Sequence, residues 1–224
     1  MKITYLGHAS LAIETNGKHL IVDPFITGNE LAKNIDINTL KADYILVTHA
    51  HGDHVADVET IAKNTGATIV SNAEIAGYYQ TKGFNAHPMN HGGSWSFDFG
   101  KVKYVNAIHS SSFPDGAFGG QPGGFVIEAD KNIYIAGDTA LTFDMKLIPM
   151  RTKLDLAILP IGDNFTMDVT DASIAAEFVE VNQVLGYHFD TFGYIKIDHE
   201  NAKQIFANKQ KELLLLEVGS SIEI

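Results

Sequence analysis

Short apolar runs, most of them bounded by Gly, Asn or Asp, divide the chain into predicted strands. The β-rich runs at 2–14 and 18–24 flank an Asn-Gly pair, which is typical of a tight hairpin turn. The mostly apolar runs at 42–49 and 154–163 predict strands that are buried on both faces. Further strands are predicted at 67–71, within 93–109, within 125–139 and at 212–224.

Apolar residues at helical spacing predict four helices between these strands. A helix at 53–66 is expected to end at Gly66, and a helix at 198–210 is expected to begin at the N-cap residue Asp198. The other two helices are predicted at 72–83 and 168–183. Strands therefore alternate with helices through most of the chain, which is typical of an α/β fold.

Two parts of the chain share one pattern. "AIETNGKHLIVDP" matches "VIEADKNIYIAGDT", and "KADYILVTHAHGDH" matches "KLDLAILPIGDNFT", with agreement at the Lys, Asp and terminal Asp positions. Chance similarity between common strand–helix units is the alternative interpretation. We interpret residues 1–224 as a single domain of two pseudo-equivalent halves. Each half would be a mixed sheet with helices on one face, and the two sheets would pack together in a four-layer αβ/βα sandwich.

Composition and charge narrow the classes of function. The 224 residues are 45% hydrophobic and carry a net charge of −11, whereas nucleic-acid binders usually present a basic face. The chain has no cysteine, so any metal site must be built from histidines and carboxylates. We see neither a signal peptide nor an apolar run long enough to span a membrane, and we expect a cytoplasmic protein.

The segment "VTHAHGDHVAD" places four metal-capable side chains within six residues. His49 and His51 are two residues apart at a strand end, so their side chains project to the same side and suit one ion. Asp53 and His54 lie at the start of the following helix and suit a second ion. A polar loop with incidental histidines is the alternative, but three of only ten histidines fall in this short stretch.

Three more candidate ligands lie where other predicted strands end. His109 follows "VKYVNAI", Asp138 follows "IYIAG", and His188 follows "VLGY". The carboxylate of Asp138 is of a kind that can bridge two ions. Each of the three, taken singly, is equally well explained as a hydrogen-bonded junction residue, but together they supply the number of groups that two ions require.

These residues carry a resemblance to a known family. "THAHGDH" matches the HxHxDH motif of the metallo-β-lactamase superfamily, and the order of His109, Asp138 in "GDT" and His188 is similar to that superfamily's. "YLGHAS", "PIGDNFTMD" and "HFDTF" look like its small, uncharacterised metal-dependent hydrolase branch, which is similar to the ascorbate-phosphate lactonase. The resemblance implies a first metal at His49, His51 and His109, a second at Asp53, His54 and His188, and Asp138 as the bridge.

The same resemblance implies a hydrolase in which two divalent ions share a water molecule and deliver it as hydroxide. We expect zinc, with manganese, iron or nickel as alternatives. Asp53 would orient the hydroxide and move its proton, and His8 is expected to act near the site instead of being a buried structural histidine. Asp163 and Asn164, on the loop that corresponds to the histidine-rich segment, are expected to contact substrate.

The long Gly-rich loop at 110–124 is predicted to be a lid or rim, with Phe113 and Phe118 covering a substrate; an inert surface loop is the alternative. The remaining four histidines are predicted to lie at the surface: His19, His87, His91 and His199.

We therefore predict a metal-dependent hydrolase that acts on a small-molecule ester, lactone or phosphodiester. The alternatives are a non-enzymatic metal-binding or sensing module on a retired hydrolase fold, and a nucleic-acid phosphodiesterase. The length and acidic charge count against the last of these. We expect a small-molecule substrate, no nucleic-acid partner and no membrane partner, and the sequence leaves a homo-oligomer open.

Overall fold

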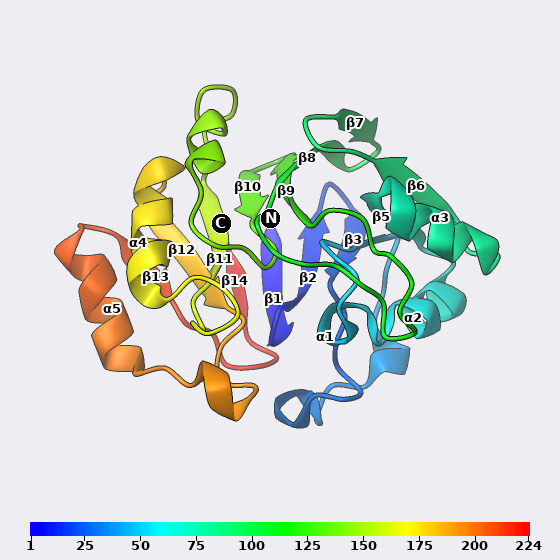
Figure 1. Cartoon of the computed structure of the whole chain (residues 1–224), viewed down its shortest axis with the longest axis horizontal. Helices are drawn as coiled ribbons and strands as arrows, with labels where there is room; N and C mark the ends of the chain where they lie inside the picture. Colours follow the sequence, from blue (N-terminus) through cyan, green and yellow to red (C-terminus); the bar gives the residue numbers. More distant parts are fainter.

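The computed structural model describes residues 1–224, and its two seven-stranded sheets pack face to face (Figure 1). The first sheet has the order β14 (Ser221–Glu223), β1 (Lys2–Gly7), β2 (Ser10–Thr15), β3 (Lys18–Val22), β4 (Tyr44–Leu46), β5 (Thr68–Asn72) and β6 (Ala86–Met89). The second has the order β13 (Glu212–Leu214), β12 (Gln183–Tyr187), β11 (Leu156–Pro160), β10 (Asn132–Ile135), β9 (Gly123–Glu128), β8 (Gly100–Asn106) and β7 (Ser94–Phe97).

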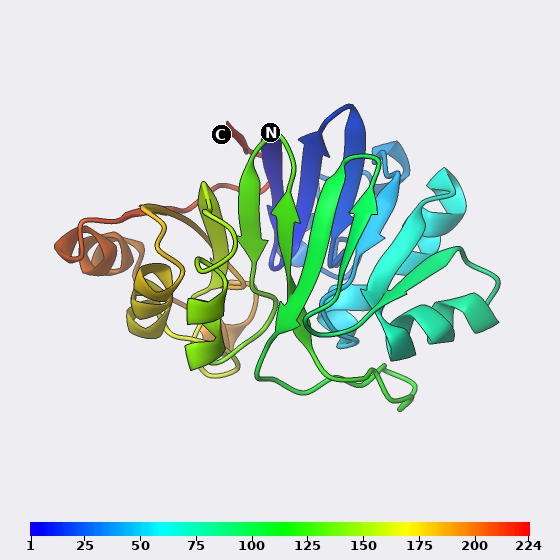
Figure 2. The same ribbon diagram turned by 90° about the horizontal axis from the view of Figure 1, so that it is seen from above.

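Helices cover the outer face of each sheet, as Figure 2 shows from above. The first sheet is covered by α1 (Gly52–Val55), α2 (Val58–Thr65) and α3 (Ala73–Thr81), and the second by α4 (Val169–Phe178) and α5 (His199–Asn208). Four short 3-10 turns complete the chain: η1 (Glu30–Ala32), η2 (Ile37–Thr39), η3 (Phe143–Leu147) and η4 (Gly193–Ile195). No helix has both the length and the hydrophobicity to cross a lipid bilayer.

Three apolar clusters separate the four layers. The central cluster joins the facing surfaces of both sheets, with Leu11 and Val70 from the first and Phe125 and Ile158 from the second. One outer cluster packs the second sheet against α4 and α5, and the other packs the first sheet against α1, α2 and α3. The predicted four-layer α/β sandwich is confirmed, since each sheet buries one face against its partner and the other under helices.

The two sheets repeat one pairing scheme. From β14 to β6 and from β7 to β13, three antiparallel pairs are followed by three parallel pairs. The predicted hairpins join β2 to β3 and β9 to β10, at equivalent places in the two sheets. The division of residues 1–224 into two pseudo-equivalent halves stays a prediction, and this shared scheme is what the duplication would produce.

Several predicted elements are divided in the structure. The run at 2–14 forms two strands, because the chain turns at His8, whose φ is +55°. The helix predicted at 53–66 is broken into α1 and α2, because the Asp57 amide donates to the carbonyl of Pro24 instead of continuing the helix. The predicted end of this second helix at Gly66 is confirmed by a left-handed C-cap.

The second half shows similar changes. The helix predicted at 168–183 ends at Phe178, and the backbone of Glu180 then turns with φ +56°. The segment 212–224 is not one strand: β13 joins the second sheet and β14 crosses to the edge of the first. β6 was not predicted from the sequence, and it contains Pro88, a residue that disfavours strands. The proline is tolerated here because β6 lies at the edge of its sheet.

Candidate metal centre

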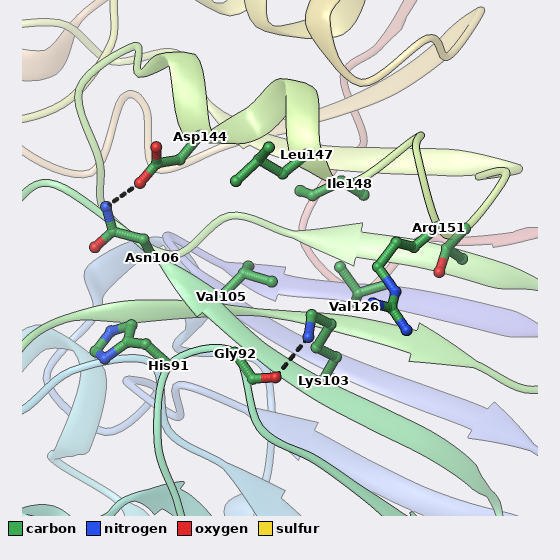
Figure 3. A pocket seen from close by; sticks show the side chains of 11 residues that line it. His91, Gly92, Lys103, Val105, Asn106, Val126, Asp144, Leu147, Ile148 and Arg151 are labelled. Atoms are coloured by element: carbon green, nitrogen blue, oxygen red, sulfur yellow. Dashed lines mark hydrogen bonds between the residues drawn. The ribbon is translucent and has the colours of Figure 1, made fainter.

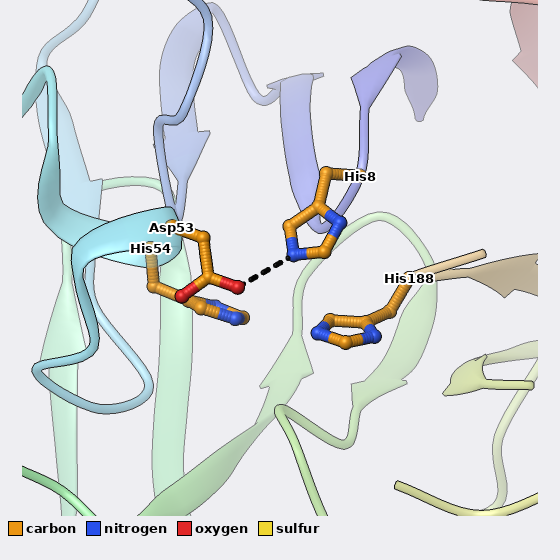
Figure 4. Close-up of side chains that lie close together, drawn as sticks. All are labelled: His8, Asp53, His54 and His188. Atoms are coloured by element: carbon orange, nitrogen blue, oxygen red, sulfur yellow. Dashed lines mark hydrogen bonds and ion pairs between the residues drawn. The ribbon is translucent and has the colours of Figure 1, made fainter. Parts of the chain in front are cut away.

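The predicted ligands converge at one edge of the molecule, where strands of both sheets end. His49, His51, Asp53 and His54 follow β4 of the first sheet. The others follow three strands of the second sheet: His109 after β8, Asp138 after β10, and His188 after β12. The turn between β1 and β2 brings His8 to the same place (Figure 4). Strand ends of two facing sheets therefore place all of these side chains around one point.

The side chains form two groups. In the first, the ligand atoms of His49, His51 and His109 lie within 4.8 Å of one another. In the second, drawn in Figure 4, the atoms of His8, Asp53, His54 and His188 satisfy the same limit. The first group has the membership expected for the first ion. The second contains the three residues expected for the second ion and adds His8.

Asp138 lies between the two groups. Its Oδ2 atom is 3.8 Å from His49 Nε2 and 3.6 Å from His109 Nε2 in the first group. The same oxygen is 3.3 Å from His54 Nε2 and 3.0 Å from His188 Nε2 in the second. One carboxylate oxygen thus faces two imidazoles of each group, which is the position that a bridging ligand requires.

Unpartnered buried atoms test whether these residues suit a metal. His54 Nε2, His188 Nδ1 and Asp138 Oδ1 are buried and make no hydrogen bond. Leaving buried polar atoms without a partner is costly, and native proteins avoid it. A divalent cation among the imidazoles and carboxylates would satisfy such atoms with the donor set that borderline metals prefer. The residues present therefore fit the group that the sequence predicted.

The electrostatics favour the metal-binding forms of His49 and Asp138, whereas the carboxylates of Asp138 and Asp23 raise the pKa of His54 well above its usual range despite its burial. Burial, together with the neighbouring imidazoles, lowers the pKa of His49 well below its usual range, so that this ring is neutral at pH 7. Burial alone would raise the pKa of Asp138, but His188 and His54 hold it well below its usual range. Neutral imidazole and ionised carboxylate are the coordinating forms of these side chains.

Asp23 is a functional candidate that sequence reasoning did not single out. Its Oδ2 atom accepts from Thr48 Oγ1 at 2.6 Å and lies 2.9 Å from His54 Nδ1, and all three side chains are buried. Thr48 Oγ1 also lies 3.0 Å from His49 Nδ1. Such contacts fix the orientation of imidazole ligands. The signal was present in the sequence, because Asp23 is the residue that aligns with Asp138 in the predicted repeat.

His8 occupies a tight turn and not a strand, which corrects its predicted position. Its ring is fully buried, with Nε2 3.0 Å from Asp53 Oδ2 and Nδ1 2.9 Å from Thr191 Oγ1. Burial and the nearby His188 lower the pKa of His8 to about 4. A neutral His8 therefore contacts the Asp53 carboxylate through Nε2, and the Asp53 side chain remains about a third exposed.

A cavity of about 800 Å³ opens over the two groups. Beyond the candidate ligands, its wall contains Ser110 and Thr191 and three aromatic side chains, Phe165, Phe192 and Tyr194. No lysine or arginine lines it. Asp163 and Asn164, expected to contact substrate, are exposed and are not part of the wall, whereas Phe165 of the same turn is.

The Gly-rich loop at 110–124 contributes only Ser110 to this cavity. Phe113 is buried and stacks on Tyr78 of α3, with ring centroids 3.7 Å apart, so the expectation that it covers a substrate is wrong. Asn72 Nδ2 also donates to the carbonyls of Gly119 and Gln121. These contacts attach the loop to the first half, and the aromatic wall of the cavity comes from the second half.

The four histidines predicted at the surface lie outside both groups. His199 is exposed and contacts Asp190, and His19 and His87 are half-buried. His91 is half-buried as well, with Nε2 2.8 Å from the carbonyl of Pro122, and it lines a separate cavity on the second sheet.

Known proteins match both the sequence and the structure. A family model described as the beta-lactamase superfamily domain matches residues 2–188. A UPF0173 metal-dependent hydrolase of Flavobacterium johnsoniae is 76% identical over 225 residues, and one of Christiangramia forsetii is 68% identical over 226; each alignment covers 100% of both chains. Igni18, a metallo hydrolase of Ignicoccus hospitalis, has a similar structure with a TM-score of 0.90 and 32% identity, covering 99% of this chain and 97% of its own.

The family model spans most of the chain, and the relatives align over its whole length. The chain therefore belongs to the beta-lactamase superfamily and, within it, to the UPF0173 metal-dependent hydrolase family.

Proposed function

We propose that the protein is a metal-dependent hydrolase that binds two divalent ions and cleaves a small, neutral carbonyl compound such as an ester or a lactone. The observation that carries the proposal is the position of Asp138, whose Oδ2 atom faces two imidazoles of each group. The proposed ligands are His49, His51 and His109 for one ion and Asp53, His54 and His188 for the other, with Asp138 between them. Zinc is the proposed metal, since all-His/Asp sites of this kind accept it readily.

When bound, divalent ions supply Lewis acidity, which activates a water molecule and polarises a carbonyl group. The protein supplies orientation and proton transfer. Asp53 is the only one of the proposed carboxylate ligands with a substantially exposed side chain, and it also lines the cavity. It is placed to accept a proton from the attacking water and pass it to the leaving group. His8 and Thr191 hold Asp53 in that position through two consecutive contacts.

The cavity wall supports a neutral substrate. Proteins commonly add Arg or Lys to any metal ions that hold a phosphodiester, and no such residue lines this cavity. Phe165, Phe192 and Tyr194 instead offer apolar surface beside the ligands. A neutral ester or lactone with an apolar or aromatic substituent fits this wall better than a phosphodiester does.

The test combines metal content with turnover. Protein loaded with zinc should bind two ions per chain by elemental analysis and should hydrolyse aryl esters or lactones faster than matched phosphodiesters. Chelator-treated protein should be inactive and should regain activity on reloading. Two bound ions without turnover of any ester, lactone or phosphodiester would favour a non-enzymatic metal-binding module, and preferential cleavage of the phosphodiester would overturn the substrate class.

A further inference from the structure

A second cavity, of about 290 Å³, lies on the outer face of the second sheet (Figure 3). Lys103 and Val105 of β8 and Val126 of β9 form its floor, and Lys103 and Val126 are paired neighbours across the two strands. Leu147, Ile148 and Arg151, from η3 and the turn after it, form the facing wall. None of the proposed metal ligands lines this cavity, so it is separate from the centre described above.

Two cations face this cavity without an acidic partner. Arg151 is the only arginine in the chain, and its guanidinium makes no ion pair or side-chain hydrogen bond. Lys103 Nζ donates to the carbonyl of Gly92 at 2.6 Å but has no carboxylate within 4.0 Å. By contrast, the neighbouring Lys101 pairs with Glu128. Both positive charges therefore remain available to an anionic ligand.

The rest of the wall is mostly apolar and ends in a polar pair. Val105, Val126 and Ile148 cover the middle of the cavity. At the other end Asn106 Nδ2 donates to Asp144 Oδ2 at 2.8 Å, so the one carboxylate of the wall is hydrogen-bonded and lies away from Arg151 and Lys103 (Figure 3). The cavity therefore offers a cationic end, an apolar middle and a hydrogen-bonding end.

We propose that this cavity binds a small organic anion, with its carboxylate or phosphate between Arg151 and Lys103 and its apolar body over Val105, Val126 and Ile148. A guanidinium and an ammonium on adjacent walls suit an anionic oxygen cluster, because Arg can donate two parallel hydrogen bonds and Lys adds a point charge. The volume fits a metabolite-sized ligand and excludes a folded macromolecule.

The test uses calorimetric titration of the full-length, zinc-loaded chain with 4-phenylbutyrate, phenyl phosphate and the neutral analogue 4-phenylbutanamide. At least one anion should bind saturably, and the amide should bind about tenfold more weakly. Arg151→Gln and Lys103→Gln should each weaken the anion by about tenfold, whereas Lys101→Gln on the same strand should not. The stronger of the two anions identifies the carboxylate or the phosphate class.

Binding at the metal centre is distinguished because it would be lost on chelation and unchanged in the Arg151 and Lys103 variants. The proposal is overturned if neither anion binds, if the amide binds as well as the anions, or if both variants bind like the wild type. None of these results depends on hydrolytic activity, so they are independent of the proposed function.

Discussion

Asp23 Oδ2 lies 2.9 Å from His54 Nδ1, in a contact from which solvent is fully excluded. The other nitrogen of the same ring faces Asp138. An outer carboxylate of this kind fixes the ring orientation and strengthens the ligand, so Asp23→Asn should weaken metal binding by about 10- to 100-fold. Competition with a chromophoric chelator measures this, with the exposed Asp98→Asn as control. Equal affinities in the two variants would show that Asp23 has no such role.

The carboxylate of Asp53 should matter for turnover more than for folding. Asp53→Ala removes the proposed proton acceptor and one ligand of the second ion, while the first group keeps all of its histidines. Turnover should fall by at least about 10²-fold, with some metal retained on the first site. Steady-state kinetics and metal content of the same preparation test this together. Full activity in Asp53→Ala would exclude the assigned role.

Removal of the metal should destabilise the whole fold. The proposed ligands come from both sheets, so each ion bound only by the native state stabilises it by about 2.7 kcal/mol at a hundredfold excess over its Kd. For a chain of this size, chelation should lower Tm by about 5–10 °C for each ion removed. Thermal unfolding with and without chelator measures the change. Asp138→Asn, which lacks the proposed bridging carboxylate, should respond much less to the chelator.

The aromatic wall should select the substrate. Tyr194 is 78% exposed and Phe165 is 50% exposed, and both line the cavity over the candidate ligands. Tyr194→Ala should raise KM for an aryl ester by about two- to tenfold, the contribution of one aromatic contact, and should leave a methyl ester unaffected. Phe143→Ala, exposed elsewhere on the surface, is the matched control. A parallel loss for both esters would point to general damage to the site.

Gly162 supports the loop that carries His188. A Cβ atom at Gly162 would lie 2.2 Å from the His188 carbonyl oxygen and 3.0 Å from Ile195 Cβ. Gly162→Ala should therefore displace His188 and reduce binding of the second ion more than the first. Metal stoichiometry tests this. Gly77→Ala, in α3 with nothing within 4 Å of the added atom, should leave metal content unchanged.

The sequence predicted most of the architecture because the decisive signals are local. Apolar runs, the Asn16–Gly17 hairpin and the helix caps at Gly66 and Asp198 act over a few residues, and the structure has them where they were expected. The ligand candidates were also recognisable, because histidines and carboxylates at strand ends are rare enough to be informative.

Features that depend on packing between distant segments could not be predicted. At the turn, the His8 carbonyl accepts a hydrogen bond from the backbone amide of His188, which is far away in the sequence. The aromatic wall depends on how residues 161–167 and 191–194 fold over the strand ends. The position of Phe113 is set by stacking on Tyr78. Likewise, nothing in the local sequence shows that Lys103 and Arg151 share a cavity, since strand pairing and the turn after η3 bring them together.

The two groups at the sheet edge draw on residues from His8 to His188, so they are distributed over most of the chain and over both sheets. Only the segment from His49 to His54 is local, and neither group is complete in the unfolded polypeptide, because the contacts that join this segment to the other residues are long-range and form only once the sheets have docked. Metal would therefore arrive after folding and not guide it, in contrast to short zinc-nucleated domains. The newly made chain would pass through a folded, metal-free state. The identity of the bound ion would then depend on the geometry of the folded site and on which cations are available in the cell.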